Sequence, residues 1–219
     1  MKVILFGGTG MVGQGVMREC LLDPEVTQLL AVGRHSTTQK HPKLRELVVA
    51  DLHDLSAVEQ QLAGFDACFF TLGTSAAGLS ESEYSRVTYD LTLAVARTLV
   101  RLNPGMTFIY VSGMGTDSSE RGRIMWARVK GKTENALLAI GFRRAFMFRP
   151  GLIVPMHGIK SRTTLYRVSY AILSPVMPLI RRIFPKAVTT TEQMGRAMLA
   201  VAERGNPRAV LEAADINRA

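Results

Sequence analysis

The chain has 219 residues, of which 47% are hydrophobic and 21% are charged, and its formal net charge at pH 7 is +9. This length suits one α/β domain with a full core, and the composition excludes a disordered or fibrous protein. The positive charge permits an anionic partner, but no basic run is interleaved with aromatic residues, which argues against a nucleic-acid-binding protein.

Short apolar runs alternate with stretches of helical periodicity along most of the chain. Buried strands are predicted over residues 2–6, 28–33, 47–50, 67–71, 107–111 and 145–148, with a further short strand over residues 209–212. Helices are predicted over residues 11–22, 55–62, 80–102, 124–140 and 192–204. This alternation predicts an α/β fold, a doubly wound parallel sheet of the Rossmann type, that spans residues 1–219 as a single domain.

The N-terminus and the cysteines bear on the cellular compartment. The apolar run at the start of the chain ends at Gly7, before it is long enough for a signal-peptide core or a membrane span. Cys20 and Cys68 each lie in an apolar stretch, which fits buried reduced thiols better than a disulfide. Both observations predict a cytoplasmic protein without a transmembrane segment.

A glycine-rich turn joins the first predicted strand to the first predicted helix. Backbone without Cβ turns tightly and approaches a pyrophosphate closely, while the helix dipole and the N–H groups at the helix start stabilise its charge. The pattern predicts a dinucleotide site formed by Gly7, Thr9, Gly10, Met11, Val12 and Gly13. A tight turn that binds nothing is the alternative interpretation.

The end of the second predicted strand bears on the choice of dinucleotide. Arg34 stands where a protein that prefers NAD usually carries an acid for the ribose 2′-hydroxyl. A guanidinium pairs with a 2′-phosphate, so the predicted cofactor is NADP, with NAD as the alternative and with His35 or Lys40 as further contacts. A solvated surface arginine is the other interpretation. Asp51 suits either a hydrogen bond to the adenine amino group or a turn.

Several motifs in a fixed order carry a resemblance to a known family. They are the glycine turn, Asp51-Leu52, Thr71-Leu72-Gly73-Thr74, Tyr110-Val111-Ser112, residues 126–131 (WARVKG) and Arg149-Pro150-Gly151. Over residues 1 to about 155 the chain resembles the atypical short-chain dehydrogenases/reductases, and most of all the branch around the mammalian Tat-interacting oxidoreductase-like tumour suppressor. The resemblance implies cofactor contacts from Asp51, Leu52, Thr71, Leu72, Gly73, Lys130, Pro150, Gly151, Leu152 and Ile153.

The same resemblance implies a catalytic set. In the family, a serine after the fifth strand orients the substrate carbonyl, and a tyrosine four residues before a lysine transfers the proton. Residues i and i+4 share a helix face, so the lysine holds the nicotinamide ribose and lowers the tyrosine pKa. Ser112 and Lys130 match these positions, whereas Trp126 replaces the tyrosine. An indole N–H has no acid–base chemistry near neutral pH.

Three explanations of Trp126 remain open. The protein binds a dinucleotide without turnover; another group, such as Tyr84, Tyr89 or Ser112 with water, supplies the proton; or the motif is locally misaligned. Ser112 and Lys130 also have plain alternatives, as a residue that bends the strand end and as a solvated helix lysine.

The last third of the chain corresponds to the substrate lid of the family, here residues 156–187. This stretch is apolar with flanking basic residues, which suits an apolar or anionic substrate, a membrane surface or a partner, as well as a pair of core-covering helices. The resemblance also implies a homodimer through the helices over residues 80–102 and 124–140. No metal site is predicted, because the histidines are scattered and the cysteines lie far apart.

Two functions follow from these observations. The first is an NADP-dependent oxidoreductase or epimerase-like enzyme that acts on a small carbonyl or alcohol substrate, with Ser112 and Lys130 in the site. The second is a non-catalytic, dinucleotide-sensing regulatory protein, which the tryptophan at position 126 favours.

Overall fold

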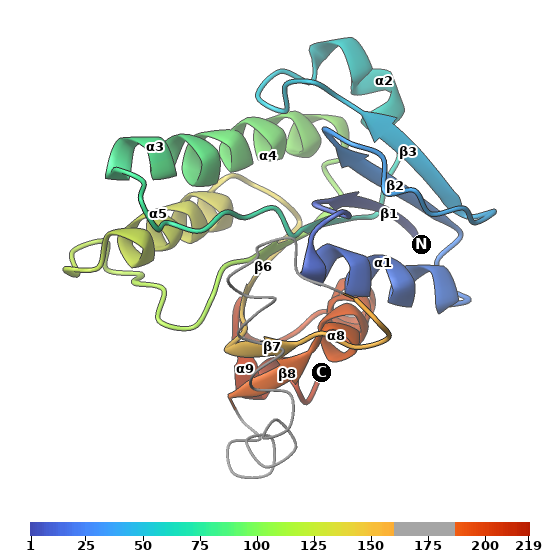
Figure 1. Cartoon of the computed structure of the whole chain (residues 1–219). Coiled ribbons are helices and arrows are strands. Elements are labelled where there is room, and N and C mark those ends of the chain that lie inside the picture. Colours follow the sequence, from blue (N-terminus) through green and yellow to red (C-terminus); the bar gives the residue numbers. More distant parts are fainter. Residues whose placement is uncertain (160–186) are drawn as a thin grey trace.

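The computed structural model describes residues 1–159 and 187–219, and within them a seven-stranded parallel sheet forms the centre of the molecule (Figure 1). The strand order is β3-β2-β1-β4-β5-β6-β9, and every neighbouring pair is parallel. The strands are β1 (Lys2–Phe6), β2 (Gln28–Gly33), β3 (Leu44–Val48), β4 (Ala67–Phe70), β5 (Thr107–Val111), β6 (Arg144–Arg149) and β9 (Val210–Glu212). Because the order reverses between β1 and β4, the predicted doubly wound α/β fold is confirmed.

Helices cover both faces of this sheet (Figure 1). On one face lie α1 (Met11–Leu22), α8 (Thr191–Arg204) and α9 (Ala213–Ile216). On the other face lie α3 (Glu81–Ser85), α4 (Leu91–Leu102) and α5 (Met125–Ala139). The short α2 (Glu59–Leu62) follows a 3₁₀ turn at Ser56–Val58 and packs against α4.

The residues of β1 show why the strands of this sheet are continuous apolar runs. Val3 and Leu5 pack in the core beneath α1 and α8, whereas Ile4 and Phe6 pack in the core beneath α4 and α5. All four side chains are fully buried. Since both faces are covered, ligands of such a sheet bind at the carboxyl ends of the strands, beside the point where the strand order reverses.

The predicted helix over residues 80–102 contains a π-helical turn at Arg86–Asp90, between α3 and α4. Its start has the Ser-x-x-Glu spacing of a capping box. The Glu83 N–H donates to Ser80 Oγ (3.3 Å), and the Ser80 N–H donates to Glu83 Oε2 (2.8 Å). This reciprocal cap satisfies two backbone donors that the first turn of a helix leaves without partners.

Other differences from the predicted elements are short. β3 begins at Leu44 rather than at residue 47, because the exposed Arg45 and Glu46 interrupt its apolar run. The sequence pattern did not predict α9 or the parallel pair of β7 (Leu152–Val154) and β8 (Val188–Thr190). The apolar stretch 164–184 and most of the predicted lid, residues 156–187, lie outside the described residues.

The two cysteines are as predicted. Cys20 and Cys68 are both buried and free. Burial raises the pKa of each thiol well above its usual range, so both stay protonated and behave as small apolar side chains.

Candidate functional site

The glycine turn is closed by a backbone hydrogen bond and by contact with the end of β4. The Gly10 N–H donates to the Gly7 carbonyl (2.9 Å), and Gly7 has a φ of +89°, which favours glycine. A Cβ added at Gly13 would lie 2.1 Å from the Gly7 carbonyl oxygen. The Thr71 hydroxyl donates to the Phe6 carbonyl (2.7 Å) and lies against the turn. The turn therefore accepts no side chain at Gly7 or Gly13.

The helix that follows the turn starts with open backbone donors. Gly10 is the N-cap residue of α1, it makes no side-chain cap, and no acidic residue lies in the first turn. Backbone N–H groups at a helix start have no acceptor within the helix, and the helix dipole adds positive potential there. Met11, Val12 and Gly13 thus lie at an end of α1 that suits an anionic group.

A hollow opens beside the turn and the carboxyl end of β2. It brings together several residues predicted to contact a cofactor, and its lining is formed by Gly7, Gly8, Thr9, Ala31, Val32, Gly33, Arg34, His35, Thr37, Leu52 and Leu72. Arg34 is exposed at the rim, whereas Leu52 is buried in the wall. The hollow thus combines backbone groups of the glycine turn, an apolar wall and the guanidinium of Arg34. These are the features expected around the phosphate and adenosine of a nucleotide.

Asp51, Lys40 and Gly73 are not among the residues that line this hollow. Asp51 accepts a hydrogen bond from the His53 N–H (2.9 Å), which is the turn geometry that the sequence left open. Lys40 is exposed and is not part of the lining. Gly73 follows Leu72 and is exposed.

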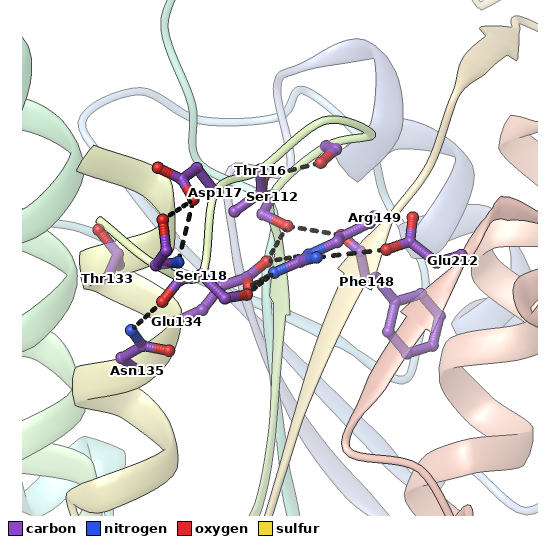
Figure 2. Close-up of polar contacts among 12 residues, drawn as sticks. Ser112, Thr116, Asp117, Ser118, Thr133, Glu134, Asn135, Phe148, Arg149 and Glu212 are labelled. Carbon is purple, nitrogen blue, oxygen red and sulfur yellow. Dashed lines mark hydrogen bonds and ion pairs between the residues drawn. The ribbon is translucent and has the colours of Figure 1, made fainter. Parts of the chain in front are cut away.

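Ser112 belongs to a buried polar cluster behind the carboxyl end of β5 (Figure 2). Its hydroxyl donates to the carboxylate of Glu134 on α5 and lies 3.2 Å from the Phe148 carbonyl oxygen. Both partners are acceptors only. Since a serine hydroxyl has one hydrogen, that hydrogen points into the protein, and only the lone pairs of Ser112 Oγ remain for a ligand.

The Glu134 carboxylate is held by a second group, the guanidinium of Arg149. The Arg149 Nε lies 3.0 Å from Glu134 Oε1, and Arg149 also donates to Ser118 Oγ (2.5 Å) and Glu212 Oε1 (3.3 Å) (Figure 2). The two paired side chains are 11% and 1% exposed. Pairing with this carboxylate raises the pKa of Arg149, so the guanidinium stays charged. The sequence reasoning missed Glu134, although it stands four residues after Lys130 on the same helix face.

Lys130 lies next to this cluster. Its ammonium donates to the Ser112 carbonyl (3.0 Å) and sits 5.6 Å from the centre of the Tyr110 ring. Burial lowers the pKa of Lys130 to about 8, and the negative charge of Glu134 opposes part of that shift. Lys130 is therefore a cation that loses its proton much more readily than a solvated lysine.

Trp126 and two of the predicted substitute donors, Tyr84 and Tyr89, differ in their surroundings. Trp126 is half-buried one helical turn before Lys130, against Gly115. Tyr84 is buried, with 2% of its surface exposed. Tyr89 stacks against Lys132, whose amine lies 4.5 Å from the ring centre. Because Lys132 is two residues beyond Lys130, it projects from a different face of α5.

The segment after β6 runs along β8. The Pro150 carbonyl accepts a hydrogen bond from the Met114 N–H (2.9 Å), which ties this segment to the loop after Ser112. The Leu152 N–H donates to the Ala187 carbonyl (3.0 Å), and Ile153 pairs with Thr189 in the β7–β8 ladder. The predicted nicotinamide contacts of residues 150–153 thus lie beside the loop after Ser112, and the Leu152 N–H is already bonded.

In residues 1–159 and 187–219, no three His, Cys, Asp or Glu side chains are arranged to hold a metal ion. The helices of the same residues are all too short or too polar to cross a membrane.

Sequence relatives agree with this site. Residues 7–139 match the family model described as NAD(P)H-binding. The chain is 30% identical over 159 residues to "Protein fmp52, mitochondrial" of Emericella nidulans, which is 69% of this chain and 66% of that protein. It is 24% identical over 214 residues to "Protein FMP52-2, mitochondrial" of Scheffersomyces stipitis, covering 95% of this chain and 90% of that one. The chain thus spans just under two thirds of the first relative.

Solved structures share the fold at low identity. The Bordetella bronchiseptica enzyme WbmF, solved in complex with NAD+, has a TM-score of 0.68 at 15% identity and covers 99% of this chain and 76% of its own. DesIV, a dTDP-glucose 4,6-dehydratase from Streptomyces venezuelae solved with NAD and TYD, has a TM-score of 0.64 at 17% identity, with 96% and 74% covered.

The comparisons correct one prediction and establish the family. Both fungal relatives are named mitochondrial, which contradicts the cytoplasmic location predicted from the sequence. The family model covers more than half of the chain, and the strand order and the glycine turn agree with it. The chain belongs to the NAD(P)H-binding family, and its fold is of the Rossmann type.

Proposed function

We propose that this protein binds NADP(H) and acts as an oxidoreductase or epimerase-like enzyme on a small carbonyl or alcohol substrate. The observation that carries the proposal is the closed glycine turn, which opens onto a hollow with Arg34 at its rim. The WbmF enzyme, solved with NAD+, and the dTDP-glucose 4,6-dehydratase DesIV, solved with NAD, support a redox role for the dinucleotide. Arg34 favours NADP over NAD, because a guanidinium pairs with a 2′-phosphate.

Each part of the site has a role in this proposal. The turn from Gly7 to Gly13 and the start of α1 hold the pyrophosphate, and Leu52 and Leu72 enclose the adenosine. The nicotinamide, when bound, supplies hydride transfer. Lys130 holds the nicotinamide ribose, and the segment at residues 150–153 faces the ring.

The proton that balances hydride transfer needs a source other than residue 126. When a carbonyl is reduced, its carbon accepts a hydride and its oxygen accepts a proton. Ser112 directs its hydrogen to Glu134, whereas the Lys130 ammonium has a pKa of about 8 and releases a proton near neutral pH. We therefore assign the proton donor role to Lys130, directly or through one water.

A non-catalytic dinucleotide sensor is the second candidate. It is favoured by Trp126, and by the inward orientation of the Ser112 hydroxyl, which leaves no hydrogen for a substrate carbonyl. In this case the protein binds the nucleotide tightly and turns nothing over.

The two candidates are separated by measuring binding and turnover on the same preparation. Calorimetric titration with NADPH and NADH is expected to show binding of both, and Arg34→Ala is expected to weaken NADPH alone. Catalysis is then tested with a panel of small aldehydes and ketones, by following the loss of the NADPH nicotinamide absorbance as the hydride is transferred. Turnover that disappears in Lys130→Met supports the enzyme; binding without any turnover supports the sensor; absence of binding overturns both.

The proposal extends to the domain organisation, the nearest family branch and the oligomeric state of the protein. We propose that the chain forms one domain, that it is close to the branch around the Tat-interacting oxidoreductase-like protein, and that it dimerises through α4 and α5. Light scattering tests the last point, and a monomer at micromolar concentration would contradict it.

A further inference from the structure

The segment that follows Arg34 is folded back by a single carboxylate, that of Glu46. Glu46 lies on β3, opposite Ala31 of β2 in the parallel register. Its carboxylate accepts hydrogen bonds from the Ser36 hydroxyl (2.7 Å), from the Thr37 N–H (2.6 Å) and from the Thr37 hydroxyl. The Glu46 carboxylate therefore accepts three hydrogen bonds from two adjacent residues.

One of these two residues, Thr37, lies in the wall of the hollow assigned to the nucleotide. Thr37 lines that hollow together with Arg34 and His35, and its methyl group would be 3.3 Å from a Cβ placed at Gly8. Hydroxyl and backbone N–H groups beside an arginine are the donors that a phosphate group uses. Here they are bonded to Glu46, so Arg34 and His35 are left to meet a 2′-phosphate.

The carboxylate also adds a negative charge beside the same wall. The hydrogen bonds from Thr37 and Ser36 hold the pKa of Glu46 below its usual value, although burial acts in the opposite direction. Glu46 is therefore ionised at neutral pH. A 2′-phosphate within several ångströms of it experiences like-charge repulsion that water weakens but does not remove.

We propose that Glu46 is a specificity-determining residue that restrains the preference for NADPH over NADH. It does so by occupying the Ser36 and Thr37 donors and by placing a carboxylate next to the site of the 2′-phosphate. The inference rests on the proposed binding of the dinucleotide in this hollow. Arg34 attracts the 2′-phosphate and Glu46 opposes it, so the two residues together set a weak preference.

The competing interpretation is that Glu46 only folds the segment over residues 34–38. In that case, loss of Glu46 loosens the wall of the hollow for any adenine dinucleotide, and NADPH and NADH weaken together. In the proposed case, loss of the charge frees donors for the 2′-phosphate, and NADPH alone binds more tightly. The two interpretations predict changes of opposite sign for NADPH.

The test is calorimetric titration of the full chain with NADPH and with NADH at low and moderate ionic strength. Glu46→Gln removes the charge but keeps a carbonyl oxygen that still accepts from the Thr37 N–H. We expect the Kd for NADPH to fall by a factor of about three to ten at low salt, and by less at moderate salt, with the Kd for NADH unchanged. The matched control is Glu25→Gln, which removes the same charge from an exposed position before β2.

A second substitution tests the role of the donors. Thr37→Val removes the hydroxyl that is bonded to Glu46. Combined with Glu46→Gln, it is expected to remove part of the gain. An unchanged or weaker NADPH affinity in Glu46→Gln, with both nucleotides still bound by the unaltered protein, overturns the inference alone. If the unaltered protein binds neither nucleotide, the proposed function fails as well.

Discussion

The hydroxyl of Ser112 donates to the carboxylate of Glu134, and this contact ties the end of β5 to the middle of α5. Arg149, at the end of β6, pairs with the same carboxylate. Three elements that border the predicted catalytic face therefore share one buried negative charge. A buried charge is tolerated only while its partners are in place, which makes this cluster a determinant of stability as well as of geometry.

Glu134→Ala is expected to lower the free energy of unfolding by about 3–5 kcal/mol, because it leaves the Arg149 guanidinium without its buried partner. Ser112→Ala removes the hydrogen bond to the Glu134 carboxylate and is expected to cost about 1.5–3 kcal/mol. Urea denaturation of each variant measures both changes.

The control is Glu81→Ala, which breaks the ion pair with Arg128 at a largely exposed carboxylate. Pairs of that kind contribute about 1 kcal/mol or less. If Glu134→Ala costs no more than Glu81→Ala, the cluster does not stabilise the protein as argued.

Gly13→Ala is expected to abolish binding of NADPH and NADH together. The added methyl group would lie 2.1 Å from the Gly7 carbonyl oxygen and 2.8 Å from the Thr71 hydroxyl, so the turn must open. Calorimetric titration measures the loss, and thermal unfolding shows whether the variant still folds. Gly105→Ala is the control, because a Cβ at Gly105 meets no atom within 4 Å. Nucleotide binding that survives Gly13→Ala would place the nucleotide elsewhere.

The fold was predictable because most of its determinants are local in the sequence. β1 is a continuous apolar run since Val3 and Ile4 are buried on opposite faces of the sheet, and the glycine turn follows it directly. β7 and β8 were not predicted, since each has three residues and pairs with a strand distant in the sequence.

The site was predictable only where its residues belong to a motif. Ser112 and Lys130 were found by their positions, and the structure brings them together. Glu134 and Glu46 were missed, because an acidic residue on a helix or an edge strand looks like a solvated one until its partner is known. The partner of Glu134, Arg149, lies 15 residues away in the sequence. The partner of Glu46, Thr37, lies 9 residues away. Contacts of that kind depend on the folded arrangement.

The lowered pKa of Lys130 predicts a pH dependence of stability. In the folded protein this pKa is about 8, whereas the ordinary value for lysine is 10.5. Between these values the unfolded chain binds more protons than the folded one, so the contribution of Lys130 to stability increases as the pH rises from about 8 towards 10.5. The expected size is on the order of 1–3 kcal/mol.

Urea midpoints measured from pH 7 to pH 10 test this dependence by comparison between variants. Lys130→Met is expected to be more stable than the unaltered protein at pH 7 and to lose that advantage by pH 10. Lys132→Met, at an exposed position on the same helix, is the control and is expected to change stability equally at both pH values. A constant difference between Lys130→Met and the unaltered protein would show that Lys130 titrates alike in both states.

Trp126→Tyr is expected to create or increase reductase activity, because it places a phenol one helical turn before the Lys130 ammonium. A positive charge at that spacing lowers the pKa of a phenol, which makes it a better proton donor than an indole. The measurement is NADPH oxidation with a panel of small aldehydes and ketones, and Trp126→Phe is the control that removes the indole without adding an acid. A gain in Trp126→Tyr alone shows that the rest of the site is competent for hydride transfer. Equal gains in both variants would instead mean that the indole merely obstructs the substrate. No activity in either variant or in the unaltered protein, with NADPH still bound, would favour the sensor, because Ser112 directs its only hydrogen to Glu134 and cannot assist the carbonyl.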